Sequence, residues 1–286
     1  NAMTLLLVVS CIWAFSFPLI KGNLTGFDPN FVSFARMLLS LAVFAPFVRP
    51  AFFPGPTRAA LACIGAVQFG LMYVAYIASY QFLPAHMIVL LTTTTPIFVA
   101  VFTDLLDRRV RTVSMGAAAL AVTAGVVIKY PDQPLSANLA GIVLVQLSNI
   151  AFAVGQIWYR RIAAHTPRWN DRRAFALLYM GGVAVTGAFS LATTDYSRLS
   201  LSPPQWATLG YLGLIASGVC FFIWNKGARS VNESTLAIMN NLKIPLGIVA
   251  SLILLGEPTD PLRLAAGVLL MGAALLITER ARPARR

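Results

Sequence analysis

Carboxylates are scarce in this sequence, and none lies inside a long apolar run. The 286 residues include only ten Asp and Glu, against 22 Lys and Arg. All ten acids fall at the ends of apolar runs or in the segments between them. Proton-coupled carriers usually keep an acid or a histidine at membrane depth. The scarcity argues against proton coupling, and it leaves no paired carboxylates for acid–base catalysis.

Histidine and cysteine are nearly as rare. The two histidines stand alone, and the three cysteines, Cys11, Cys63 and Cys220, are isolated within apolar runs. They have neither the pairing pattern of disulfides nor the spacing of metal ligands. A Walker A motif is also missing. We therefore expect no metal site and no cofactor, and neither an enzyme nor a primary pump.

Charge of both signs is low, which excludes an ordinary soluble domain. Only 11% of the residues are charged, compared with about 25% in soluble proteins. Hydrophobic residues make up 58% of the chain. The net charge of +12 does not indicate nucleic acid, because the basic residues fall in short segments between apolar runs, where they act as topology signals. The expected surroundings are a lipid bilayer, and the expected fold is an all-α integral membrane protein.

The apolar runs predict ten transmembrane helices of roughly 18 to 23 residues each, near the length that a bilayer requires. Sixteen basic residues fall on one side of the membrane and four on the other, with Arg36 and Lys243 inside spans. This bias predicts that both termini are cytoplasmic. The expected spans are 4–21, 31–49, 58–82, 86–105, 112–130, 138–160, 174–193, 205–225, 234–255 and 262–279.

The chain reads as two similar halves. Thr94-Thr95-Pro96-Ile97-Phe98 in the fourth span resembles Lys243-Ile244-Pro245-Leu246-Gly247 in the ninth, with a proline at mid-span in both. Five spans is an odd number, so the second half enters the membrane from the opposite side. We predict two inverted five-helix repeats, 3–135 and 136–286. Inverted repeats are typical of transporters that bind their solute where the repeats meet.

The most informative stretch lies in the ninth span. Asn240, Asn241, Lys243 and Pro245 fall near the middle of an apolar run, too deep for the lysine to snorkel easily. Polar groups at this depth face either a wet cavity or a polar partner. We interpret Asn240 and Lys243 as part of a solute site, with Pro245 loosening the helix. The alternative is a buried polar cluster that joins helices.

Other polar and aromatic residues fall on single helix faces. In the sixth span, Gln146, Asn149 and Gln156 form one stripe, read either as cavity lining or as interhelical hydrogen bonding. In the third span, Tyr73 and Tyr76 lie deep enough to line a cavity, or simply to pack.

Further residues are candidates for the pathway or its gate: Trp13, Phe17, Thr92, Pro96 and Pro245. Thr92 and its neighbours either contact solute or repair the helix next to Pro96. Arg36 either snorkels or pairs with an exposed carbonyl. Trp158, Tyr159 and Trp224 are expected to anchor the inner ends of their spans rather than to contact solute.

The ordered set of features resembles the EamA-type transporters of the drug/metabolite transporter (DMT) superfamily. It includes Trp13-Ala14 through Pro18, Arg36, the mid-span prolines and Gly256-Glu257-Pro258. The first half has Leu106-Asp107-Arg108 where the family keeps Gly-Glu. The resemblance implies a central cavity between repeats, alternating access and residence in the inner membrane. Within the family the chain is most similar to exporters of aromatic amino acids.

The sequence therefore predicts a facilitative transporter that exports small metabolites, aromatic and other neutral amino acids in particular. Two alternatives stay open: a carrier of another solute class, such as lipophilic drugs or nucleotide sugars, and a non-transporting scaffold or receptor. Oligomeric state and direction of flow are undetermined. The predicted substrate-binding residues are Tyr73, Tyr76, Asn149, Gln156, Asn240 and Lys243.

Overall fold

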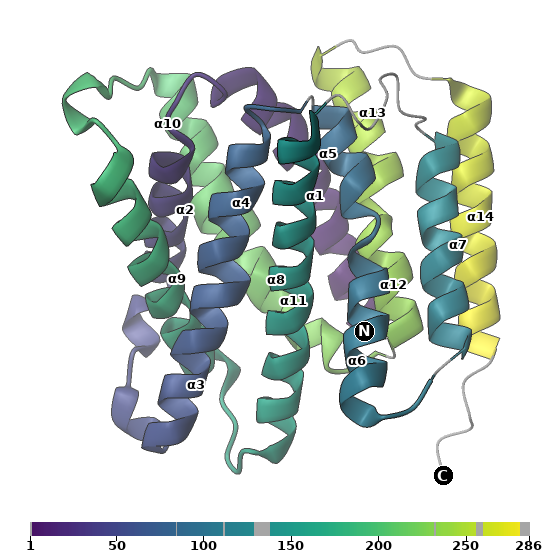
Figure 1. Cartoon of the computed structure of the whole chain (residues 1–286), viewed down its shortest axis with the longest axis horizontal. Coiled ribbons are helices and arrows are strands. Elements are labelled where there is room, and N and C mark those ends of the chain that lie inside the picture. The colour runs from purple at the N-terminus through teal and green to yellow at the C-terminus, as the bar shows by residue number, and fades with distance from the viewer. Residues whose placement is uncertain are drawn as a thin grey trace.

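The structure, a computed structural model, describes residues 2–83, 85–110, 112–128, 138–231, 233–255 and 260–280. These residues form helices and turns and no strand. The helices run roughly side by side (Figure 1). Gly256-Glu257-Pro258 and the expected repeat boundary at 135 and 136 lie outside the described residues.

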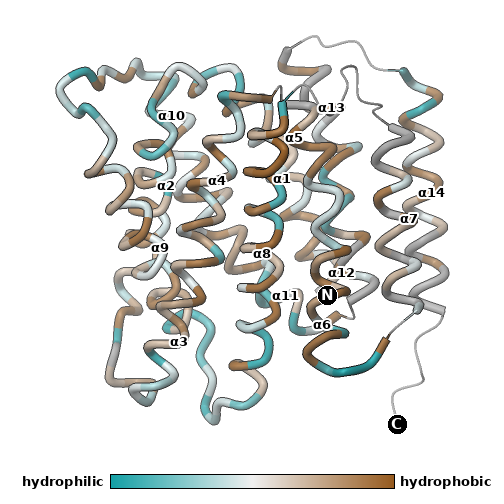
Figure 2. The backbone as a smooth tube through the Cα atoms, in the orientation of Figure 1, coloured by the Kyte–Doolittle hydropathy of each residue, from teal (hydrophilic) through white to brown (hydrophobic). Residues whose placement is uncertain are grey.

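Seven helical spans are long and apolar enough to cross a membrane: Met3–Asn23, Pro29–Phe47, Gly55–Ser79, Met87–Asp107, Leu139–His165, Asp171–Thr193 and Pro203–Ala228. They match seven of the ten expected ranges. Hydrophobic residues run along these helices, and hydrophilic ones gather at the connections (Figure 2). The remaining three ranges are also helical where the structure describes them, so the all-helical membrane fold is confirmed, while the count of ten stays a prediction.

The first half begins with α1 (Ala2–Asn23) and α2 (Pro29–Phe44), the latter capped by Asp28, whose side chain accepts from two backbone N–H groups. Two short 3-10 turns follow. The third span contains α3 (Gly55–Gly65), a π-helical segment η3 (Ala66–Leu71) and α4 (Met72–Ser79). The fourth consists of α5 (Ala85–Thr92) and α6 (Thr95–Asp107), and α7 (Thr112–Ile128) closes the half.

The second half repeats this order. It contains α8 (Leu139–His165) and α9 (Asp171–Thr193), and then α10 (Pro203–Gly210), the π-helical segment η6 (Tyr211–Val219) and α11 (Cys220–Ala228). It ends with α12 (Glu233–Asn241), α13 (Lys243–Leu255) and α14 (Pro261–Arg280). A π-helical segment interrupts the third span of each half, and a break interrupts the fourth.

Contacts between the halves come in matching pairs. Helix α1 packs on α11 and α13, as α8 packs on α4 and α6. Likewise, α2 packs on η6 as α9 packs on η3. The pairs α2 with α9 and α7 with α14 join equivalent helices, and α7 and α14 lie side by side at one edge (Figure 1). This pattern is what two related five-helix units would produce; the repeat boundaries themselves stay a prediction.

Glycines allow the closest of these contacts. A Cβ added at Gly65 would lie 1.8 Å from the carbonyl oxygen of Leu178, and one at Gly181 would lie 1.9 Å from that of Ala62. Helices α3 and α9 therefore touch backbone to backbone. Small residues at such crossings are typical of membrane helices, where close packing rather than hydrophobic exclusion holds helices together.

Candidate functional site: a central cavity

One cavity with about 610 Å³ of empty space is lined by seven of the expected spans. Seven of the eleven residues predicted for the site or pathway line it: Trp13, Phe17, Tyr73, Tyr76, Thr92, Asn149 and Lys243. They come from helices far apart in the sequence, so only the tertiary fold brings them together. Their role in binding stays a prediction.

The other four predicted residues lie elsewhere. Pro96, Gln156 and Asn240 line a smaller neighbouring cavity of about 200 Å³. Pro245 is buried in the first turn of α13, where its missing N–H helps to separate α12 from α13. Pro96 takes the matching place in α6. Both prolines therefore account for the broken helices.

The two breaks are tied together. The Nδ2 of Asn241 donates to the carbonyl of Thr93, between α5 and α6, at 3.1 Å. Its Oδ1 accepts from Asn240 at 3.2 Å, and the Oδ1 of Asn240 accepts from Lys243 at 3.3 Å. A chain of amides therefore links the lysine to the opposite break. Among the described residues, the bond to a carbonyl of the opposite break is made by Asn241, while Lys243 donates to Asn240.

Lys243 begins α13, where the helix dipole is positive, and faces the cavity. Within the part of the chain that the structure describes, its one hydrogen bond, to Asn240, uses one of the three donors of an ammonium group. The ammonium also lies 6.0 Å from the centre of the Trp13 ring, within cation–π range. Donors therefore remain for a solute.

Arg36 is the second cation of the cavity, and only 3% of it is exposed. Its Nε and Nη2 donate to the Ser217 hydroxyl at 3.2 and 3.0 Å, and Nη2 also donates to the Tyr73 hydroxyl at 3.0 Å. Neither of the two expected roles applies, because the guanidinium is held by hydroxyls at depth rather than by a carbonyl or the membrane surface.

The π-helical segment η6 explains why Ser217 is available. A π-helix displaces the regular i to i−4 bonding, and here side chains satisfy the carbonyls. Trp13 Nε1 donates to the Ala216 carbonyl at 2.8 Å, and the Tyr179 hydroxyl donates to those of Ser217 and Gly218 at 2.6 and 2.9 Å. The segment is thereby fixed with the Ser217 hydroxyl toward Arg36.

Unsatisfied polar atoms collect at this cavity. Within the described residues, three buried side-chain atoms have no hydrogen-bond partner, and two of them, Arg36 Nη1 and Ser16 Oγ, belong to lining residues. A buried donor left without a partner costs about 1–3 kcal/mol, and more when it is charged. The lining contains two cations and no carboxylate. This arrangement is suited to an anion.

Most other polar groups of the lining are bonded within the protein. The Tyr76 hydroxyl pairs with that of Tyr80 at 2.8 Å. Thr92 donates to the Val89 carbonyl, three residues back, while also facing the cavity, so both interpretations of the threonine run fit the geometry. Asn149 uses its amide nitrogen on Leu91 and Thr94 at 3.0 and 3.1 Å, which leaves its Oδ1 for a solute.

Two expectations about aromatic residues are wrong. Trp224 and Tyr159 are fully buried, so they do not anchor their helices at a lipid surface. Trp224 instead donates to Gln156 Oε1 at 2.8 Å, and Tyr159 donates to Asp171 at 2.6 Å. Their hydrogen bonds face protein partners, because the neighbouring helices cover them.

Several lining residues were not among the predicted site residues: Ser16, Arg36, Met72, Thr95, Ser148, Phe152 and Phe221. For some the signal was present. Ser16 is three residues from Trp13 and Ser148 is adjacent to Asn149, so each shares or borders a predicted stripe. Arg36 stood out as a charge inside a span, but its partner Ser217 is 181 positions away.

The sequence is similar to that of known transport proteins along nearly its whole length. The EamA-like transporter family matches residues 1–130 and 139–279. A Pseudomonas aeruginosa protein named a probable biotin transporter is 37% identical, over 98% of each chain. The biotin transporters of Salmonella typhimurium and Escherichia coli are 35% and 34% identical, over 87% and 97% of this chain and 84% and 93% of theirs.

A crystal structure with 14% sequence identity has the same fold, with a TM-score of 0.79 over 97% of this chain and 98% of that one. The resemblance to the aromatic amino-acid exporters is not confirmed, because these relatives carry a different name. The family itself matches nearly the whole chain. The protein therefore belongs to the EamA-like transporter family of the DMT superfamily, and it is a multi-pass membrane transporter rather than an enzyme.

Proposed function

We propose that this protein transports biotin, or a monocarboxylate closely similar to it, through the central cavity. The observation that carries the proposal is the pair of cations, Arg36 and Lys243, facing a lining that has no carboxylate. The names of the relatives support the same solute.

Charge balance separates this solute from an amino acid. Biotin has one carboxylate, an uncharged ureido ring and an apolar body made of the fused thioether ring and the aliphatic chain. An amino acid adds an ammonium group, which would lie in a lining that already contains two cations and offers no anion. Burying a charge without a partner costs several kcal/mol or more. The cavity therefore favours a net anion over a zwitterion.

The rest of the lining suits the rest of the molecule. The carboxylate would accept from Arg36 Nη1 and from Lys243, both of which have donors to spare. The ureido N–H groups would donate to Asn149 Oδ1. Trp13 and Phe221, with ring centroids 4.8 Å apart, would cover the apolar body. Lining of this kind, mostly apolar with a few placed polar groups, is typical of small-molecule sites.

Uptake of radiolabelled biotin into liposomes containing the purified protein tests the proposal, with protein-free liposomes as the control. Unlabelled biotin should compete, whereas biotin methyl ester, which lacks the charge, and tryptophan should compete at least tenfold less well. Competition by tryptophan but not by biotin would refute the proposal and favour amino-acid transport.

Transport is proposed to be facilitative, because no carboxylate faces the cavity to carry a coupled proton. Labelled biotin should equilibrate along its own gradient at equal pH on both sides. Protein-dependent accumulation against that gradient, driven by an imposed pH difference, would contradict facilitative transport. Subtracting the uptake that is measured in protein-free liposomes corrects for passive movement of protonated biotin across the bilayer.

A further inference from the structure

Three cavities lie in a row along α6 and α8. The central cavity and the smaller one share Thr95 and Phe152. The smaller one extends to Val99 on α6, and a third cavity begins at Thr103 and Asp107. These α6 residues are four apart, so they form one helix face. From Thr95 to Asp107 the face spans about 18 Å at 1.5 Å per residue.

The middle cavity is the smallest of the three, and we term it the constriction. It has about 200 Å³ of empty space, compared with 610 Å³ for the central cavity and 960 Å³ for the third. Gln156 and Trp224 face it and are joined by their 2.8 Å hydrogen bond. The Trp224 ring lies 5.1 Å from that of Trp13, which lines the central cavity. Ring packing therefore connects the constriction directly to the solute cavity.

The third cavity, which we term the vestibule, is lined by Arg160, Arg161, Arg229 and His165, with Asp107 as the acid of its lining. Arg161 is paired with Asp107, across α8 and α6. Arg160 donates to the Val231 carbonyl. A solute arriving here would meet three guanidinium groups and one carboxylate.

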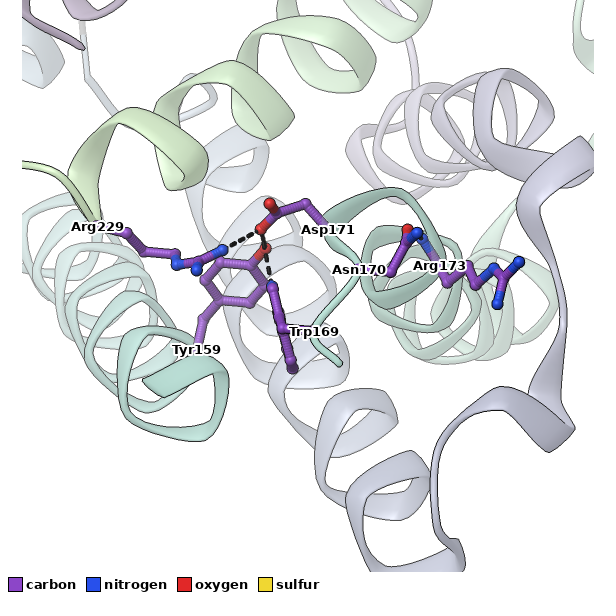
Figure 3. Close-up of polar contacts among 6 residues, drawn as sticks. All are labelled: Tyr159, Trp169, Asn170, Asp171, Arg173 and Arg229. Carbon is purple, nitrogen blue, oxygen red and sulfur yellow. Dashed lines mark hydrogen bonds and ion pairs between the residues drawn. The ribbon is translucent and has the colours of Figure 1, made fainter. Parts of the chain in front are cut away.

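Arg229 is also held in place, as Figure 3 shows. Asp171 accepts from Arg229 at 2.5 Å, from the Tyr159 hydroxyl at 2.6 Å and from Trp169 Nε1 at 2.9 Å. The Asp171 carboxylate thus fixes the Arg229 guanidinium at the wall of the vestibule. The vestibule lining has three guanidinium groups and one carboxylate, and a cleft in which one sign of charge predominates attracts ions of the opposite sign and speeds their arrival.

We propose that the vestibule is a second anion-binding site, on the same path as the central cavity and separated from it by the Gln156–Trp224 constriction. The inference rests on the proposed function for the identity of the solute, a monocarboxylate. The vestibule would bind the carboxylate weakly. From there the solute would move to Arg36 and Lys243, or it would arrive from them when transport runs in the opposite direction.

Charged thiol reagents test the anion site without any transport. Ala164 is exposed and lines the vestibule, so Ala164→Cys is introduced with Cys11→Ala and Cys63→Ala, leaving Cys220 buried. Ser200→Cys, in an exposed connection, is the matched control. The purified protein is treated with sulfonatoethyl methanethiosulfonate, which is anionic, or trimethylammonioethyl methanethiosulfonate, which is cationic.

The measured quantity is the rate of cysteine modification by the anionic reagent divided by the rate for the cationic one. This ratio should be at least about tenfold higher at Ala164→Cys than at Ser200→Cys, and Arg160→Gln should lower it. Equal ratios at the two positions would overturn the proposal.

Blocking the vestibule tests the path. After reaction with the sulfonate reagent, Ala164→Cys should lose most biotin uptake in liposomes, while Ser200→Cys keeps it. Full uptake after complete modification would show that the path does not cross the vestibule. If the unmodified protein does not transport biotin, the proposed solute fails, but the reagent ratio still decides whether the vestibule binds anions.

Discussion

Replacing Arg36 by methionine should separate a binding role from a structural one. The guanidinium is buried, and its Nη1 has no partner within the described residues. Its two other partners, the Tyr73 and Ser217 hydroxyls, already share a 2.8 Å hydrogen bond. Methionine has a similarly long, unbranched side chain, and the two hydroxyls would keep their hydrogen bond to each other. Replacing a buried charged group by a well-packed apolar one is often neutral or stabilising.

The substitution should therefore weaken the binding of the solute rather than the stability of the fold. A hydrogen bond to a charged group contributes about 1.5–3 kcal/mol, and losing it raises a dissociation constant by about 10- to 150-fold. We expect the KM for biotin to rise by that factor in Arg36→Met, with the thermal unfolding midpoint unchanged or higher. Arg36→Lys keeps the charge but cannot bridge Ser217 and the solute in the same way, so it should be intermediate.

Initial rates of uptake against biotin concentration, at equal protein per liposome, measure KM, and tryptophan fluorescence in detergent measures unfolding. Arg198→Met is the matched control, because that side chain is 87% exposed and its ion pair with Asp195 lies in a connection. Exposed pairs contribute about 0–1 kcal/mol, so this variant should behave like the parent. An unchanged KM together with lower stability in Arg36→Met would refute the reasoning and assign the arginine to packing.

Three further outcomes are expected. Lys243→Met should reduce biotin uptake at least tenfold while keeping the unfolding midpoint, measured in the same assays; loss of both would indicate a structural role. Ser217→Ala should raise the KM several-fold without lowering the maximal rate, because the serine positions Arg36 but does not contact solute; an unchanged KM would contradict this role. Gly181→Ala should lower the unfolding midpoint, since its Cβ would lie 1.9 Å from a backbone oxygen, whereas Gly210→Ala, with nothing within 4 Å, should not.

The membrane class and the broken helices could be predicted from the sequence. Long apolar runs with few charges leave a bilayer as the only favourable surroundings, because no single soluble core could bury them. Pro96 and Pro245 predicted interruptions at mid-span, and in the structure each proline lies in the first turn of the helix that follows a break. These are local properties of the chain, governed by residue type and by the hydrogen bond that proline cannot donate.

The site could be predicted only in part. Lys243 and Asn149 stood out because a polar side chain inside an apolar run is costly to bury unless it has a polar partner or faces a wet cavity. Gln156 stood out in the same way, but the structure places it in the constriction, where it is bonded to Trp224. The choice between facing solute and facing protein depends on which neighbouring helix covers a given face, and the sequence of one helix does not contain that information.

The tertiary structure alone decided the charge balance of the cavity. The sequence by itself determined that two cations lie well inside the spans and that the acids lie at their ends or between them, but not that Arg36 and Lys243 face one cavity. Arg36 is oriented by Ser217, 181 positions away, in a π-helical segment that no periodicity indicated. The proposed solute selection depends on the sum of charges and donors from seven spans, and that sum exists only once the helices have packed.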